Sequence, residues 1–179
     1  MSRPAEEGTD EELARAAHHT CYELHQMVEA AVSRSKSGDV AFLESALLHA
    51  RNLIEFFCEW PSARIVAGDF LPGWTPVSSN RFSRESRVLN NWLSHLTWRR
   101  VDWEERVPWD PIPLVVRLVD LYDAEFVEHL SPDRQDWFSG TVAVVRSKLT
   151  ELSDDPQSHF DATTSATLTT MRTFKPREQ

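Results

Sequence analysis

Apolar residues recur every three or four positions along the first third of the chain, which is the spacing of an amphipathic α-helix. A first stripe of this kind consists of Leu13, Ala17, Thr20, Leu24, Met27 and Ala31. A second stripe consists of Val40, Leu43, Leu47, Ala50, Ile54 and Phe57, with Phe42, Ala46, Leu53 and Phe56 beside it. Because a helix that is apolar over so much of its circumference is buried on several sides, the pattern predicts a helical core.

Start and stop signals bound both helices. Thr9 and Glu12 have the spacing of a capping box, and the polar stretch 33–39 is interpreted as a connector. Asp39 can cap the second helix, and Pro61 ends it near residue 60. These signals predict two long helices joined by a short polar segment.

Residues 61–80 contain three prolines and two glycines, which argue against a long regular helix. Phe70, Leu71 and Trp74 argue against full exposure of the same segment. A connection of this length in a compact domain is either a functional lid or a packed loop. We expect a packed loop over the end of the bundle.

Three further predicted helices cover about 83–103, 110–130 and 131–152. Asp110 and Ser131 each precede a proline, which is a helix-start signal. Gly140 weakens the last helix, since glycine costs about 1 kcal/mol in a helix interior relative to alanine. The sequence therefore predicts an all-α bundle of four or five helices in a single domain over 1–152. A Thr-rich tail over 153–179 is expected to be disordered or docked in extended form.

Composition and charge narrow the function classes. The chain has 179 residues and a net charge of −9, which argues against broad electrostatic binding to nucleic acid but leaves room for a local basic pocket. No apolar run is long enough to span a bilayer, and the polar N-terminus shows no secretory signal. We therefore expect a cytoplasmic protein without membrane contact. Cys21 and Cys58 are expected to be buried free thiols, with a disulfide left open as the alternative.

The predicted helix over 83–103 carries the most suggestive polar pattern. Asn91, His95 and Arg99 stand four residues apart and project from one face, with Trp98 at its border. An arginine can fork onto phosphate oxygens, an imidazole can move a proton at neutral pH, and an indole can stack on a base. The alternative is that these groups bond carboxylates such as Glu55 across a helix interface.

The predicted helix over 40–60 also carries polar residues within its apolar pattern. His49 lies on an apolar stripe, with Arg51 and Asn52 next to it, and Arg51 can pair with Glu55 four residues on. Since buried polar groups are normally satisfied by the protein, we favour a structural role in which His49 hydrogen-bonds a neighbouring helix.

Metal and cofactor motifs are weak. His18 and His25 share one face of the first helix and could join a further histidine, such as His49, His95 or His129, at a metal site. No CxxC, GxGxxG or P-loop pattern occurs. We therefore expect no metal and no cofactor.

Two stretches carry a resemblance to known proteins. They are LLHARNLIEFF over 47–57 and the N…HLT..R pattern from Asn91 to Arg99 or Arg100. With the GDFLPGW segment between them, they resemble a group of uncharacterised bacterial helical proteins over about residues 43–109. More distantly, the bundle is similar to HEPN domains. Many of these are metal-independent ribonucleases of toxin and defence systems, and two copies often pair to form the cleft.

The HEPN resemblance implies a particular candidate site. HEPN nucleases carry an arginine, usually a polar residue after it, and a histidine four to six residues later. Arg51 and Asn52 match the beginning, but no histidine follows at that spacing, so the resemblance implies a pair from two helices, Arg51 with His95. The candidate catalytic residues are His95, Arg51 and Arg99, and the candidate substrate-binding residues are Asn52, Asn91, His49 and Trp98.

Two functions follow as expectations. In the first, the protein cleaves RNA without a metal or binds a nucleotide phosphate, with His95 as general acid or base and the arginines stabilising phosphate charge. In the second, it is a non-catalytic helical interaction protein, a homodimer or an antitoxin-like partner, in which the same residues are structural.

Overall fold

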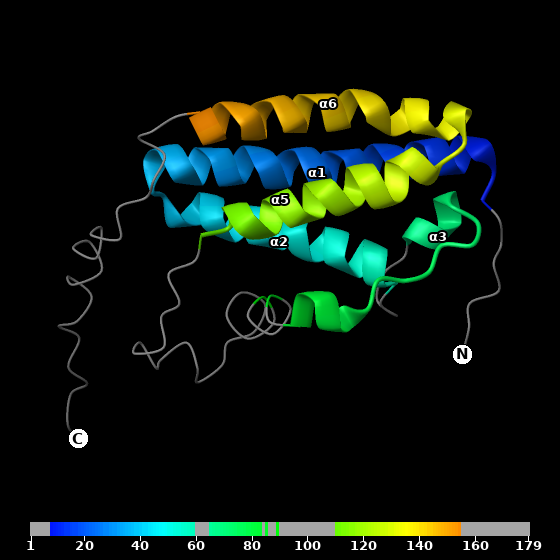
Figure 1. Cartoon of the computed structure of the whole chain (residues 1–179), viewed down its shortest axis with the longest axis horizontal. Coiled ribbons are helices and arrows are strands. Elements are labelled where there is room, and N and C mark those ends of the chain that lie inside the picture. The colour runs from blue at the N-terminus through cyan, green and yellow to red at the C-terminus, as the bar shows by residue number, and fades with distance from the viewer. Residues whose placement is uncertain (1–7, 60–64, 84, 86–88, 90–109, 155–179) are drawn as a thin grey trace, which may run out of the picture.

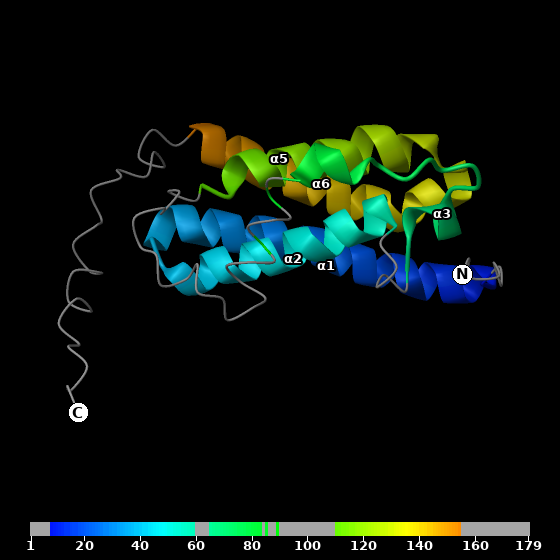
Figure 2. The same cartoon turned by 90° about the horizontal axis from the view of Figure 1, so that it is seen from below.

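The computed structural model describes residues 8–59, 65–83, 85, 89 and 110–154, and every regular element in these ranges is helical. The predicted all-α bundle is therefore confirmed. Figure 1 shows α1 (Asp10–Ser37), α2 (Val40–Cys58), α5 (Ile112–Asp120) and α6 (Pro132–Asp154) running alongside one another. Figure 2 shows two layers, with α1 and α2 in one and α5 and α6 in the other.

The start of α1 follows the predicted capping box. Glu12 N donates to Oγ1 of Thr9 at 3.3 Å, and Thr9 N donates to Oε2 of Glu12 at 2.9 Å. The end of α1 differs from the prediction, because the helix continues through most of the expected connector to Ser37. It stops where Gly38 adopts a left-handed backbone with φ of 71°, which glycine reaches without steric cost.

The ends of α2 are also set by side chains. Oδ1 of Asp39 accepts a hydrogen bond from Ala41 N at 2.9 Å, which confirms the predicted cap. The helix ends at Cys58, two residues before the expected end, and Glu59 has a positive φ of 50°. The carboxylate of Glu59 accepts from Gly68 N at 3.0 Å, so the chain reversal is tied to the following loop.

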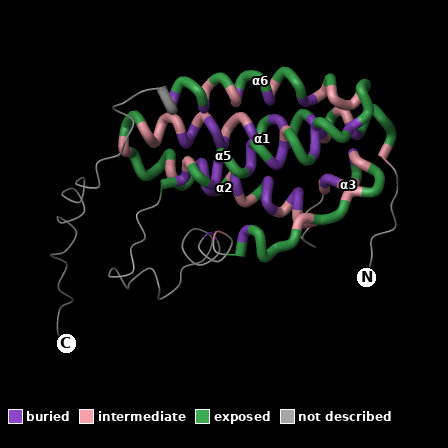
Figure 3. Tube along the Cα trace, in the orientation of Figure 1, coloured by how far each residue is buried: buried purple, intermediate pink, exposed green. Residues whose placement is uncertain are grey.

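Buried residues of α1, α2, α5 and α6 form one core cluster. Figure 3 shows buried positions along each of these helices. Aromatic side chains fill the end of the core next to the loop. The Phe126 ring lies at its centre, and six aromatic rings have centroids 5.4–6.1 Å from it, mostly edge to face. These rings belong to Phe56, Phe57, Phe70, Trp74, Tyr122 and Phe138.

The connection after α2 packs on this aromatic end. It contains α3 (Ala67–Phe70) and the 3₁₀ turn η1 (Ser79–Phe82), both too short to contradict the prediction of no long helix. Phe70 is 1% exposed and Phe82 is fully buried. For residues 65–83, the expected packed loop is therefore confirmed.

The predicted helix over 110–130 changes its winding along its length. It begins as expected, with Ile112 N donating to Oδ1 of Asp110 at 2.9 Å. After α5 the chain forms a π-helical turn, η5 (Leu121–Phe126), and a 3₁₀ turn, η6 (Val127–His129). π-Helical turns inside α-helices are rare and frequent at functional sites.

The last helix is α6, which runs unbroken through Gly140 and ends two residues beyond the expected boundary. Most of the predicted helix over 83–103 and the tail from residue 155 lie outside the described residues. None of the helices in the described part is both long and apolar enough to cross a membrane.

Candidate functional site

One carboxylate joins α1 to the polar residues of α2. His49 donates from Nδ1 to Oε2 of Glu23 at 2.7 Å, and Asn52 donates from Nδ2 to the same oxygen at 2.9 Å. The ring of Tyr22 meets the His49 imidazole edge to face at a centroid distance of 5.7 Å. The expectation that His49 hydrogen-bonds a neighbouring helix is therefore confirmed.

Arg51 lies on another flank of α2. Its Nε donates to Oε1 of Glu55 at 2.9 Å, which confirms the predicted pairing of residues four apart. Helical residues two positions apart do not face one another, so His49 and Arg51 diverge. The structure thus brings His49 and Asn52 together on Glu23 and directs Arg51 elsewhere.

The other candidate residues cannot be placed beside these. Asn91, His95, Trp98 and Arg99 lie outside the described residues. The juxtaposition of Arg51 and His95 therefore stays a prediction.

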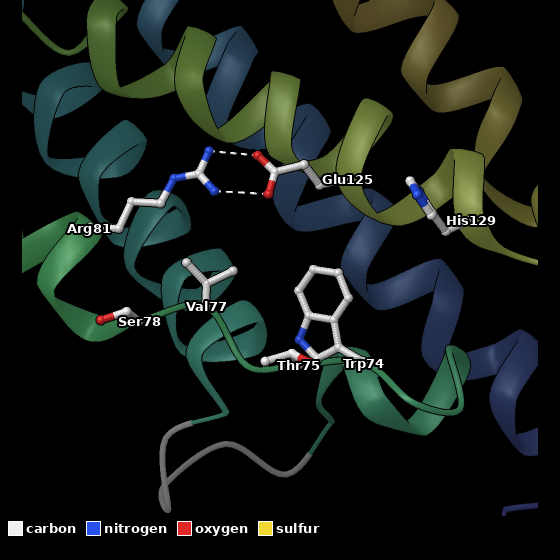
Figure 4. A pocket seen from close by; sticks show the side chains of 7 residues that line it. All are labelled: Trp74, Thr75, Val77, Ser78, Arg81, Glu125 and His129. Carbon is white, nitrogen blue, oxygen red and sulfur yellow. Dashed lines mark hydrogen bonds and ion pairs between the residues drawn. The ribbon is translucent and has the colours of Figure 1, made fainter.

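A pocket of about 470 Å³ lies on the side of the bundle that the loop covers. Its lining comes from the loop, η1, η5 and η6, and consists of Trp74, Thr75, Val77, Ser78, Arg81, Glu125 and His129. Figure 4 shows Trp74, Thr75 and Val77 along one side and the Arg81–Glu125 pair along the other. Arg81 donates in a fork to both carboxylate oxygens of Glu125, at 2.9 and 2.6 Å.

The apolar wall of the pocket is held in place by backbone contacts. The carbonyl of Phe57, in the last turn of α2, accepts from Nε1 of Trp74 at 3.3 Å and from Val77 N at 3.0 Å. This carbonyl belongs to the helix terminus, where it lacks an intrahelical partner. The loop therefore caps α2, and the cap fixes the position of the Trp74 indole.

The polar wall of the pocket, which Arg81 and Glu125 form, is held in place by hydrogen bonds from arginine side chains. Arg117 donates to the Arg81 carbonyl at 2.7 Å and to Oε1 of Glu85 at 2.7 Å, and its guanidinium lies 5.1 Å from the Phe82 ring centroid. The hydrogen bond from Arg81 lowers the pKa of Glu125, and His129 adds to this effect. In return, the hydrogen bond to Glu125 raises the pKa of Arg81. Both groups therefore stay charged, and the pocket offers one fixed cation beside one fixed anion.

This pocket was not predicted from the sequence. Trp74 was identified only as an apolar residue of the loop, and nothing in the helical spacing marks Glu125 or His129. The site joins segments about 50 residues apart, so spacing within one helix could not reveal it.

The two cysteine thiols are shielded from solvent, fully at Cys21 and partly at Cys58. Both are free thiols, as expected, but the expected burial is complete only for Cys21. Desolvation raises the pKa of both thiols. A raised pKa leaves less of the nucleophilic thiolate at neutral pH. Within the described ranges, no three histidine, cysteine or acidic residues gather as a metal site.

Comparisons with known proteins assign neither a family nor a function to the chain. No family model matches the chain, and none of the curated proteins or solved structures compared with it matches either. The expected resemblance to HEPN domains therefore stays a prediction.

Proposed function

We propose that the protein is a non-catalytic helical interaction protein that pairs with a second copy of itself. The observation that carries this proposal is that the polar residues of α2 are bonded to carboxylates of the protein itself. His49 and Asn52 bond Glu23, and Arg51 bonds Glu55, so each candidate residue on α2 is engaged by a carboxylate of the protein itself. Such bonds suit side chains that stabilise the fold.

Exposed apolar side chains on α1 and α2 are the residues that we expect to take part in the pairing. Among the described residues, the exposed large apolar side chains are Tyr22, Val40, Phe42, Leu48, Val116 and Val144. Four of these six lie on α1 and α2, and Tyr22 and Leu48 are each 54% exposed. Exposed aromatic and apolar side chains of this kind are typical of protein–protein interfaces.

Sedimentation equilibrium of the purified protein tests the pairing. We expect a concentration-dependent dimer that the double substitution Tyr22→Ser with Leu48→Ser dissociates. Since each copy carries a net charge of −9, added salt should strengthen the dimer by screening the repulsion. Val144→Ser, at an exposed apolar position of α6, is the matched control. A monomer at every concentration, or a dimer that resists the double substitution, contradicts the proposal.

Metal-independent RNA cleavage is the second candidate, and one contact favours it. The carboxylate of Glu23 at Nδ1 of His49 fixes the imidazole tautomer and leaves Nε2 as the nitrogen that could exchange a proton with a ribose hydroxyl. A histidine oriented by a carboxylate is a recurring element of acid–base catalysis. The likeness to HEPN domains adds His95 and Arg99 as further participants.

A cleavage assay with labelled RNA in EDTA separates the two candidates. The interaction protein leaves the RNA intact, and His49→Ala lowers its melting temperature. The ribonuclease cuts the RNA, and His49→Ala or His95→Ala abolishes cutting while circular dichroism shows the fold retained. Cleavage that survives both substitutions excludes the proposed catalytic residues.

A further inference from the structure

We propose that the pocket formed by the loop, η1, η5 and η6 binds a small zwitterion, an α-amino acid with an aromatic side chain. The pocket presents an indole wall at Trp74 opposite an ion pair of Arg81 and Glu125 (Figure 4). An aromatic amino acid carries the complementary set of groups: a flat apolar ring, a carboxylate and an ammonium. The ring would stack on Trp74, the carboxylate would bind Arg81, and the ammonium would bind Glu125.

The ion pair selects against ligands of a single charge. A phosphate or a simple carboxylate that approaches Arg81 meets the carboxylate of Glu125, and a simple amine that approaches Glu125 meets the guanidinium. A zwitterion can bind both groups at once, because each of its two charges meets the member of the ion pair that has the opposite sign.

Both charged groups have hydrogen-bonding capacity to spare. The fork to Glu125 uses one N–H of each terminal nitrogen of Arg81, and a guanidinium has five N–H donors in all. Each oxygen of Glu125 likewise retains a second lone pair. The side chains of Arg81 and Glu125 are 41% and 47% exposed, so a ligand can reach them without opening the fold.

The size and rigidity of the pocket fit a small ligand. The pocket is an open depression, and its volume of about 470 Å³ leaves room for a ligand of the size of an amino acid. Trp74 is already fixed by its hydrogen bond to the carbonyl of Phe57, so stacking on it requires little further ordering. The exposed hydroxyls of Thr75 and Ser78 stand at the rim as additional polar contacts.

The backbone that carries Glu125 supports the proposal independently. Glu125 belongs to the π-helical turn η5, which interrupts a segment predicted as one continuous helix. Such turns recur at binding and catalytic sites. The pocket shares no residue with the Glu23–His49–Asn52 contact, so this inference does not depend on the proposed pairing of two chains.

Isothermal titration calorimetry with three aromatic probes, and with inorganic phosphate for comparison, tests the selectivity of the pocket. The probes are L-phenylalanine, phenylacetate, which lacks the ammonium, and phenethylamine, which lacks the carboxylate. We expect L-phenylalanine to bind about tenfold or more tightly than either analogue, since each analogue lacks the group that would bind one member of the ion pair. Equal binding of all three probes, or no heat from L-phenylalanine, overturns the proposal. Tighter binding of inorganic phosphate overturns it in favour of an anion site.

Substitutions in the ion pair locate the binding. Arg81→Gln and Glu125→Gln should each weaken L-phenylalanine binding about tenfold. Arg146→Gln, which removes the ion pairs to Asp120 and Asp123 outside the pocket, should leave it unchanged. If Arg81→Gln does not fold, the variant Trp74→Leu is tested instead. Saturation-transfer NMR then measures whether saturation still passes from the protein to the ring protons of L-phenylalanine. Loss of the saturation transfer supports the site at Trp74, and its persistence overturns it.

Discussion

Oε2 of Glu23 lies 2.7 Å from Nδ1 of His49, so a carboxylate of α1 holds a histidine of α2. The same oxygen accepts from Asn52 at 2.9 Å, which makes Glu23 the common partner of two residues three apart on α2. The side chain of His49 is 13% exposed and that of Glu23 is 24% exposed, so water can replace these bonds only in part. The contact therefore contributes to the packing of α1 against α2.

Removal of this carboxylate should destabilise the protein. Glu23→Ala leaves Nδ1 of His49 and Nδ2 of Asn52 without their acceptor, and we expect the free energy of unfolding to fall by about 1 kcal/mol. Urea denaturation followed by circular dichroism measures the change. Glu44→Ala, at an exposed position of α2, is the control and should stay within about 0.5 kcal/mol of the parent. Equal effects of the two substitutions would show that the Glu23 contact contributes nothing.

His49 and Arg51 should act independently in a double-mutant cycle. Their bonds run to Glu23 on α1 and to Glu55 on α2, and the two side chains leave α2 on different flanks. We expect the effects of His49→Ala and Arg51→Ala on the free energy of unfolding to add within about 0.5 kcal/mol. Urea denaturation of the parent, both single variants and the double variant measures the coupling. A coupling above about 1 kcal/mol would show that the two residues share one site after all.

The helix boundaries could be predicted because local chemistry sets them. Thr9, Asp39 and Asp110 each cap a helix through a hydrogen bond to the backbone two or three residues on, and such bonds can be recognised in a short sequence window. The end of α1 was predicted too early, because serines can stay helical and Gly38 provides the actual stop. The π-helical turn η5 was not predicted, since its apolar spacing resembles that of an α-helix.

The polar contacts likewise fall into those that could be predicted from the sequence and those that could not. The Arg51–Glu55 pair follows from a spacing of four residues within one helix. The Glu23–His49 contact joins residues 26 apart, and Arg81 and Glu125 are 44 apart. Partners on different helices depend on how the helices pack and rotate, and a single sequence does not specify this. The pocket, which is built by two stretches of chain far apart in the sequence, could not be predicted for this reason.

The buried hydroxyl of Tyr122 gives a third prediction. Thr20 donates from Oγ1 to the Ala17 carbonyl at 2.9 Å, so its only hydrogen is used and Tyr122 must donate to Oγ1 across 3.0 Å. Tyr122→Phe removes a donor but leaves Thr20 bonded to Ala17, and should lower the free energy of unfolding by about 1 kcal/mol. Thr20→Val leaves the fully buried Tyr122 hydroxyl with only the sulfur of Cys21, at 3.8 Å, as a weak partner, and should lower the free energy of unfolding by about 2 kcal/mol.

Urea denaturation of these two variants and of the double variant Thr20→Val with Tyr122→Phe measures the difference. The double variant should be more stable than Thr20→Val alone, since replacement of both partners leaves no stranded group. A double variant less stable than Thr20→Val would show that the loss of Thr20 does not leave the Tyr122 hydroxyl unsatisfied.

The Arg81–Glu125 pair gives a fourth prediction, on the dependence of stability on pH. The hydrogen bond from Arg81 lowers the pKa of Glu125 below its ordinary value of 4.5, so the folded protein favours the carboxylate. A lowered pKa stabilises the fold fully above 4.5, and this contribution is lost as the pH falls through the folded-state pKa. Since both side chains are more than one third exposed, solvent screening limits the contribution to about 0.2–1 kcal/mol.

Glu125→Gln should therefore be slightly less stable than the parent protein at neutral pH, and the two should converge at a pH well below 4.5. Urea denaturation across this interval, at low ionic strength, measures the difference between their free energies of unfolding. Glu128→Gln, at an exposed acidic position of η6, is the matched control and should follow the parent at every pH. Molar salt should reduce the neutral-pH difference, because the Debye length then falls to about 3 Å. A difference that persists unchanged in acid would mean that the loss at Glu125→Gln comes from packing, and that the ion pair itself does not stabilise the loop.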